Sequence, residues 1–302
     1  MVAAAENMQA FGWDLFPDNR DSVFLGSGSI AGDELDISSF VVLPGFVDVH
    51  VHLREPGFSY KETFNSLPVS SAAKELPIYC VNTNKPQISI TFDAAWGNED
   101  TQKILNILKE NNVKSTFFMT GGWVKQYPND VKAIYEQGHD LGNHSANHKN
   151  MSSLSNEEIC NELDPVTEDV KKLTSYQMNL FRPPYGDYDN HVIVKARECG
   201  YFSIQWSVDS LDWKNYGVDA IVNEVLNNKE LKAGAIILMH NGAKYTAQAL
   251  PKIIEGLKNK GYEIVPVSQL IYTDNYHINS EGKQIKNEQQ TSTTKETVTM
   301  IN

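Results

Sequence analysis

Short apolar segments alternate with amphipathic segments from about residue 85 to residue 270, and this alternation constrains the fold more than any other feature. Strands that alternate with helices form βαβ units, and such units build a parallel sheet. The expected fold class is therefore α/β, with about seven units closed as a distorted (β/α)7-type barrel; an open doubly wound sheet is the structural alternative. The expected strands are residues 87–93, 114–120, 139–145, 180–186, 201–209, 234–240 and 262–268.

Two of the intervening segments show the period of an amphipathic helix. They span residues 101–112 and 245–261, and each carries apolar residues at helical spacing on one face. The residues predicted to face the sheet are Ile104, Leu105 and Leu108 in the first helix, and Ala249, Ile253 and Leu257 in the second.

Composition excludes several classes of protein. The formal net charge is −12 without a basic run, which argues against nucleic-acid binding because that affinity depends on clustered Lys and Arg. Mean hydropathy is −0.39, and no stretch approaches the roughly 18 apolar residues of a membrane span, so no transmembrane segment is expected. Cys80, Cys160 and Cys199 are too few and too scattered for a disulfide framework or a Cys-rich zinc site. We expect a monomer.

Residues with catalytic side chains fall where the expected strands end. In a (β/α) barrel, chemistry is located at the carboxyl ends of the strands. Asp93, His144, Tyr185, Asp209 and His240 all lie at or just past such an end. The barrel interpretation therefore also predicts where the functional site lies.

The first 75 residues differ from the rest of the chain. Residues 40–64 resemble the first strand and metal signature of dihydroorotases, a family in which the equivalents of His50 and His52 bind zinc and the equivalent of Arg54 holds a substrate carboxylate. Two histidines fall short of a zinc site, which needs three or four ligands. We interpret residues 1–75 as a non-functional fragment left by a fusion or a gene-model join.

Five motifs occur in a fixed order in residues 76–274. They read TFDAAWG (91–97), HSANH (144–148), RPPYG (182–186), DSLDW (209–213) and LMH (238–240). In this order they resemble the polysaccharide deacetylase family, that is, the NodB-homology domains of carbohydrate esterase family 4. Details of the motifs are most similar to peptidoglycan and sporulation-type deacetylases of Gram-positive bacteria.

The spacing of the two histidines in HSANH suggests a metal site. An i, i+4 pair lies on one face of a helical turn and can chelate one ion. The resemblance implies that His144 and His148 hold Zn²⁺, with Co²⁺ or another first-row ion as the alternative. The family has a second Asp as metal ligand where this chain has Ala94, so the third ligand is expected to be water or, failing that, Asp100.

The resemblance also implies a role for each remaining motif residue. Asp93 is the general base that activates water, and Arg182 pairs with that carboxylate. The Tyr185 backbone N–H stabilises the oxyanion, and His240 is the general acid that protonates the departing amine. Asp212 is expected to orient His240, directly or through Arg182, and Asp209 is a second candidate for this role. Trp213 is expected to form a wall of the sugar pocket, and Leu238 is expected to line the pocket for the acetyl methyl group.

These residues lead to the expectation of metal-dependent N-deacetylation of N-acetylglucosamine or N-acetylmuramic acid in peptidoglycan, with chito-oligosaccharide as the next substrate. Two alternatives remain open: a weakly active or inactive glycan-binding module, because of Ala94, and an O-acetyl xylan esterase. The family resemblance suggests the cell envelope or the extracellular space, whereas residues 1–21 show no signal-peptide pattern, which leaves a cytoplasmic location open. Residues 275–302 are expected to form a flexible polar tail.

Overall fold

The alternating part of the sequence forms one of two structural units. The computed structural model divides the chain between Ala72 and Ala73. The described residues are 22–25, 30–31, 34–35, 41–44 and 74–287.

The first unit contains two short antiparallel strand pairs. Strand β1 (Ser22–Leu25) pairs with β4 (Val41–Pro44), and β2 (Ile30–Ala31) pairs with β3 (Glu34–Leu35). The dihydroorotase-like histidines and arginine, at positions 50, 52 and 54, lie outside the described residues.

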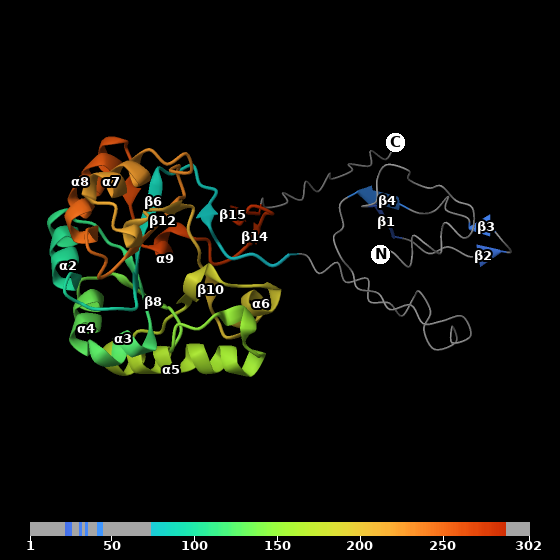
Figure 1. Ribbon diagram of the computed structural model, residues 1–302, viewed down its shortest axis with the longest axis horizontal. Coiled ribbons are helices and arrows are strands. Elements are labelled where there is room, and N and C mark those ends of the chain that lie inside the picture. Colours follow the sequence, from blue (N-terminus) through green and yellow to red (C-terminus); the bar gives the residue numbers. More distant parts are fainter. Residues whose placement is uncertain (1–21, 26–29, 32–33, 36–40, 45–73, 288–302) are drawn as a thin grey trace, which may run out of the picture. The chain divides into compact units, whose positions relative to one another are not determined.

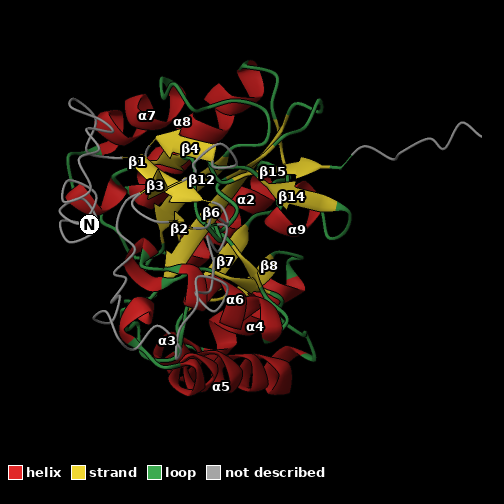
Figure 2. Cartoon of the chain, turned by 90° about the vertical axis from the view of Figure 1, so that its right-hand side faces the viewer, coloured by secondary structure: helices red, strands yellow, loops and turns green. Residues whose placement is uncertain are grey.

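The second unit is built on a parallel sheet (Figures 1 and 2). Its strands follow the order β10-β9-β8-β7-β6-β12-β11, and β13 pairs with the beginning of β6. This arrangement confirms the expected α/β class and the distorted (β/α)7-type barrel. The strands are β6 (Gln87–Ala94), β7 (Thr116–Met119), β8 (Asp140–Asn143), β9 (Leu180–Phe181), β10 (Phe202–Ser203), β11 (Val208–Asp209), β12 (Ile236–His240) and β13 (Glu263–Ile264).

The sheet curls because its two edges are joined by a very short connection. Strand β10 lies at one edge and β11 at the other, yet only residues 204–207 separate them in sequence. A connection of this length spans at most about 17 Å, so the edges must approach each other. The expected single strand 201–209 is therefore wrong: it is two strands on opposite edges.

Helices cover the outside of the curled sheet. Helices α7 and α8 pack against each other on one side, while α3, α4 and α5 lie together on another (Figure 2). All six apolar residues predicted to face the sheet are fully buried. The helices are α2 (Thr101–Glu110), α3 (Gly121–Gln126), α4 (Pro128–Glu136), α5 (Asn156–Thr174), α6 (Asn190–Glu198), α7 (Val218–Leu226), α8 (Thr246–Asn259) and α9 (Val267–Leu270).

Strand β6 shows how the pleat separates the core from the site. Its apolar residues Ile88, Ile90 and Phe92 join the main hydrophobic core. The intervening residues, which include Thr91 and Asp93, project to the opposite face, since successive side chains of a strand alternate. Among the described helices, none is both long and apolar enough to cross a bilayer.

The segment after residue 275 differs from the expected flexible tail. Strands β14 (Tyr276–Ile278) and β15 (Lys283–Lys286) form a hairpin, and β15 also pairs in parallel with β5 (Cys80–Val81). Gln284 is fully buried, and its side chain exchanges two hydrogen bonds with the backbone of Tyr272. The expectation is thus wrong for 276–286, because the long-range partner strand supplies the missing contacts; residues 288–302 lie outside the described part.

Candidate active site

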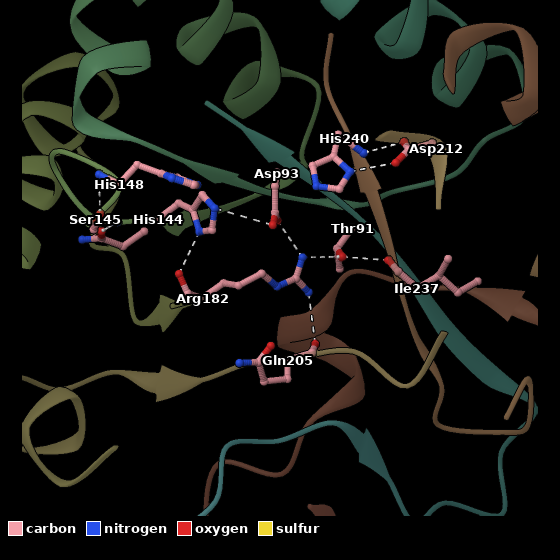
Figure 3. Close-up of polar contacts among 11 residues, drawn as sticks. Thr91, Asp93, His144, Ser145, His148, Arg182, Gln205, Asp212, Ile237 and His240 are labelled. Atoms are coloured by element: carbon pink, nitrogen blue, oxygen red, sulfur yellow. Dashed lines mark hydrogen bonds and ion pairs between the residues drawn. The ribbon is translucent and has the colours of Figure 1, made fainter. Parts of the chain in front are cut away.

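Asp93 and His240 stand opposite each other at the carboxyl ends of neighbouring strands. Their Cα atoms are register partners in the parallel pair β6–β12. His144 and Arg182 follow directly after β8 and β9, so they reach the same end of the sheet (Figure 3). The predicted motifs therefore converge where a (β/α) barrel places its chemistry.

Arg182 is fully buried and holds Asp93 in place. Its Nη1 donates to Asp93 Oδ1 at 2.7 Å and to Thr91 Oγ1 at 2.9 Å, and its Nη2 donates to the Gln205 carbonyl at 3.1 Å (Figure 3). A buried guanidinium needs such a set of acceptors, because an unpaired buried charge is costly. The geometry matches the predicted pairing of Arg182 with the carboxylate.

Phe118 lies beneath the guanidinium. The Arg182 Cζ atom is 4.2 Å from the centroid of this ring, a cation–π distance. Gly142 on the next strand leaves room for the ring, since a Cβ there would lie 2.4 Å from a ring carbon. The lack of a side chain at residue 142 thus lets Phe118 occupy this position.

The surroundings of Asp93 favour its charged form. Burial alone would raise the pKa of this carboxyl, but the charge of Arg182, followed by the electrostatic influence of the His144 and His240 imidazoles, lowers the pKa below its ordinary value. A carboxylate that is ionised and held by one rigid partner can accept a proton from water.

His240 is held by Asp212 without an intermediary. Its Nδ1–H donates to Asp212 Oδ1 at 2.7 Å, and its backbone N–H donates to Oδ2 at 2.8 Å. Thr246 Oγ1 also donates to Oδ2, at 2.5 Å. Of the two alternatives in the sequence analysis, orientation directly or through Arg182, the structure therefore shows the direct one.

Asp212 also changes the proton affinity of this imidazole. Burial lowers the pKa of His240, but the hydrogen bond and the charge of Asp212, together with the charges of Asp93 and Asp209, outweigh burial and raise it above the ordinary value. The imidazole therefore retains its proton to higher pH, as a general acid requires.

The HSANH segment is a bent loop, and the predicted helical turn is wrong. Ser145 and His148 adopt left-handed backbone conformations, with φ of 65° and 55°. Asn143 Oδ1 accepts the Ser145 N–H, and Ser145 Oγ accepts the His148 N–H, so side chains replace the helical hydrogen bonds. The loop still brings the rings of His144 and His148 together, with centroids 4.9 Å apart.

His144 presents its Nε2 lone pair to the site. Its Nδ1–H donates to the Arg182 carbonyl at 2.8 Å, and burial lowers its pKa to about 4. The neutral Nε2 lies 3.6 Å from Asp93 Oδ2. Two lone pairs thus face each other without a proton between them, an arrangement that suits a cation or a water molecule.

The donor set for zinc is incomplete. His144 and His148 offer two imidazoles, whereas Ala94 is fully buried in the hydrophobic core and contributes no ligand. Asp100, the predicted alternative, forms an ion pair with Lys103 at 2.8 Å. Within residues 74–287 and the short strands before them, no three His, Cys, Asp or Glu side chains are grouped to hold an ion. Catalytic zinc usually has three protein ligands, so the two histidines fit the ion but the third position is not filled.

Exposed aromatic side chains flank His148, and one of them, Trp96, was not predicted from the sequence. Trp96 is 62% exposed, with its ring 5.3 Å from that of His148, and Tyr185 is 69% exposed at 4.5 Å. The adjoining carbonyl of Gly97 accepts the Trp123 indole N–H at 2.7 Å, which fixes the loop. The sequence feature that could have identified Trp96 is its position, three residues after the predicted base Asp93 and just past the end of β6.

The other predicted residues occupy distinct surroundings. Tyr185 has a left-handed backbone, with φ of 60°, in the turn after the two prolines. Trp213 is 53% exposed and packs against the Lys214 ammonium, whereas Leu238 is buried next to Thr91 on the neighbouring strand. Asp209 accepts the Leu211 N–H, and burial raises its pKa.

Comparison with known proteins agrees with this geometry. The polysaccharide deacetylase family profile matches residues 81–204. A peptidoglycan-N-acetylglucosamine deacetylase of Bacillus cereus is 37% identical over 194 residues, covering 63% of this chain and 70% of its own length. The peptidoglycan-N-acetylmuramic acid deacetylase PdaA of Bacillus subtilis is 34% identical over 231 residues, covering 71% and 85%.

A solved structure adds a relative of a different kind. BA3943 of Bacillus anthracis, described as a carbohydrate esterase family 4 pseudoenzyme, superposes with a TM-score of 0.62 at 36% identity, covering 65% of this chain and 69% of that one. A mutant of BA3943 is described as having restored enzymatic activity.

Fold, site and relatives together define a hydrolase that acts on the amide bonds of N-acetyl sugars. The chain belongs to the polysaccharide deacetylase family, carbohydrate esterase family 4.

Proposed function

We propose that this protein removes the acetyl group from N-acetylglucosamine or N-acetylmuramic acid residues of peptidoglycan in the cell envelope. The observation that carries the proposal is the facing pair of Asp93, held anionic by Arg182, and His240, which is hydrogen-bonded to Asp212 and has a raised pKa. A base and an acid whose surroundings push their pKa values apart are what amide hydrolysis needs.

The proposed reaction divides proton transfer between these two residues. Asp93 accepts a proton from water while the water oxygen forms a bond to the acetyl carbonyl carbon. His240 then donates its proton to the amide nitrogen as the carbon–nitrogen bond breaks. The products are acetate and a free amino sugar.

Two other residues are proposed to position the acetyl group. The left-handed backbone of Tyr185 orients its N–H, which we assign to the oxyanion of the tetrahedral intermediate. Leu238 lies on β12, two residues before His240, and is assigned to the methyl group of the acetyl.

We assign Zn²⁺, or Co²⁺ in its place, to His144 and His148. When bound, the ion polarises the carbonyl and lowers the pKa of its water. The lone pairs of His144 Nε2 and Asp93 Oδ2, which face each other across 3.6 Å, support this assignment. With only two imidazoles from the protein, we expect weak retention of the ion.

The exposed aromatic side chains favour a glycan over a small molecule. Trp96 and Tyr185 flank His148, and Trp213 follows directly after Asp212. Aromatic faces pack against the apolar faces of sugar rings. A polymer with neighbouring sugars can use several such faces, so peptidoglycan is favoured, followed by chito-oligosaccharide; acetylated xylan is the least supported.

A second candidate is a glycan-binding protein with little or no turnover. It is favoured by the Ala94 side chain, which leaves the metal site one ligand short. The similarity to the BA3943 pseudoenzyme, and the existence of a reactivated mutant of it, point the same way.

Acetate release from purified peptidoglycan, with and without added Zn²⁺, separates the two candidates. Release that is lost in Asp93→Asn supports the deacetylase. Glycan binding without release, unchanged in Asp93→Asn, supports the binding protein. Neither binding nor release would reject both.

A further inference from the structure

Two cysteines far apart in sequence meet at the packing contact between α5 and α6. Cys160 lies in the second turn of α5, and Cys199 ends α6. Their Sγ atoms are 3.0 Å apart, although 39 positions separate them in sequence. All three cysteines of the chain are reduced in this structure.

We propose that Cys160 and Cys199 form a disulfide bond when the protein meets a disulfide oxidant such as oxidised glutathione. One protein thiolate attacks the oxidant and forms a mixed disulfide, releasing one thiol. The second protein thiolate then attacks the protein sulfur of this mixed disulfide and releases the other thiol. The two protein thiols lose two protons and two electrons in total, and the oxidant is reduced to two thiols.

The bond needs very little movement. A sulfur–sulfur bond is about 2.05 Å long, so the two sulfurs have to approach by only about 1 Å. The helices that carry them are already packed against each other. Both side chains are half-buried, which leaves them accessible to a small oxidant.

Charges around the pair distinguish the two sulfurs. Burial, followed by the neighbouring sulfur, raises the pKa of the Cys199 thiol to about 12, and Cys199 also lies at the negative end of the α6 dipole. Lys195, one helical turn earlier, interacts electrostatically with both sulfurs. We therefore assign the first attack on the oxidant to Cys160.

The closed loop would contain part of the candidate site. The residues between the two cysteines include β9, Arg182 and the Tyr185 turn. A crosslink removes conformational entropy from this part of the unfolded chain and so stabilises the folded state. Cys80, in β5, has neither of the other cysteines as a hydrogen-bonding partner and stays a free thiol.

The test uses the full chain incubated with oxidised glutathione at mildly alkaline pH. We expect the intact mass to fall by two hydrogen atoms and the titratable thiols to fall from the three of the sequence to one. Peptide mapping without reductant should place the bond between residues 160 and 199. The melting temperature should rise by about 5 °C or more and return on reduction.

Matched variants make the outcome decisive. Cys80→Ser should keep the crosslink and leave no free thiol. Cys199→Ser should stop at the mixed disulfide between Cys160 and glutathione, while Cys160→Ser should react with glutathione much more slowly at Cys199. Three thiols persisting in oxidised wild-type protein, or a bond that involves Cys80, would overturn the proposal. Crosslink formation is measured in both wild type and Cys80→Ser, so the test remains valid even if the other two variants misfold.

Discussion

Asp93 and His240 are register partners on adjacent parallel strands, so the proposed base and the proposed acid are held by the backbone hydrogen bonds of the sheet itself. Each has its own buried partner, Arg182 for the carboxylate and Asp212 for the imidazole. Each partner residue can therefore be replaced separately, although Asp93 and His240 also shift each other's pKa.

Replacing Asp212 with Asn should lower the pKa of His240. The hydrogen bond and the charge of Asp212 are the largest contributions that raise this pKa, ahead of the charges of Asp93 and Asp209, and burial opposes all of them. We expect a fall of about one unit or more, measured by NMR titration of the imidazole, which needs no turnover. If release is observed, the alkaline limb of its pH profile should shift to lower pH by a similar amount.

The same pair makes stability depend on pH in a defined direction. A histidine whose pKa is raised on folding stabilises the folded state. This stabilisation is fully present when the pH is below the pKa of the unfolded state, near 6.5, and it is lost as the pH rises through the pKa of the folded state. Unfolding of wild type and Asp212→Asn at pH 5.5 and pH 9 should show the larger difference at pH 5.5. A difference independent of pH would contradict the ion pair.

Removing Arg182 should destabilise the protein strongly. In Arg182→Met the Asp93 carboxylate remains buried without its main partner, at a cost of about 3–5 kcal/mol in the free energy of unfolding. The double variant Arg182→Met/Asp93→Asn should lose much less free energy of unfolding than the sum of the losses in the two single variants. Denaturant unfolding measures all three variants.

An exposed ion pair provides the control for this cycle. Lys252 and Asp219 are 3.0 Å apart, but the Asp219 side chain is 93% exposed. Lys252→Met should therefore cost about 1 kcal/mol or less. Strict additivity at Arg182 and Asp93 would mean that their contact contributes nothing.

Replacing Ala94 with Asp should couple metal binding to stability. Ala94 is fully buried, so the new carboxylate should lower the melting temperature when a chelator is present. Zn²⁺ should restore this loss, and the affinity for the ion should rise about tenfold or more if the carboxylate contributes ~1.4 kcal/mol. Competitive chelator titration of both proteins measures the affinity, and Ala94→Asn controls for the change of shape. Equal or weaker affinity in Ala94→Asp would mean that the third ligand comes from elsewhere.

Trp96→Ala should weaken glycan binding without affecting the fold. A large exposed ring beside His148 is expected to contribute about 1.4 kcal/mol, which corresponds to about tenfold in Kd. Calorimetric titration with glycan fragments of increasing length should show the largest loss for the longer ones. Tyr135→Ala is the control, since Tyr135 lies on α4, which leads to the amino end of β8. Equal losses in both variants would reject a specific role for Trp96.

Local patterns in the sequence predicted most of the barrel, because each strand and helix buries its own apolar face. They also placed Asp93, His144 and His240 correctly at strand ends. Features that depend on distant partners were not predictable in this way. The hairpin after residue 275 needs β5, some two hundred positions earlier, and the Cys160–Cys199 contact needs the packing of α5 on α6.

The geometry of the HSANH loop was missed for a different reason. The i, i+4 spacing of His144 and His148 fits a helical turn, but Asn143 and Ser145 offer side-chain acceptors that satisfy the backbone in a bent loop. Side-chain acceptors compete with the carbonyl groups of a helical turn for the same backbone N–H groups, and a few hydrogen bonds decide which structure forms. The two rings meet in either geometry, so the pairing was predicted although its backbone was not.

The short connection between β10 and β11 closes the sheet, and its Gln205 carbonyl is also the acceptor that holds the far side of the Arg182 guanidinium. The connection that closes the barrel and the support of the Arg182–Asp93 ion pair are thus one stretch of backbone. A residue inserted between Ser203 and Val208 would loosen both at once, so natural variation in length should be tolerated in the outer loops and not here. The closure of the barrel and the charge of Asp93 therefore depend on the same four residues.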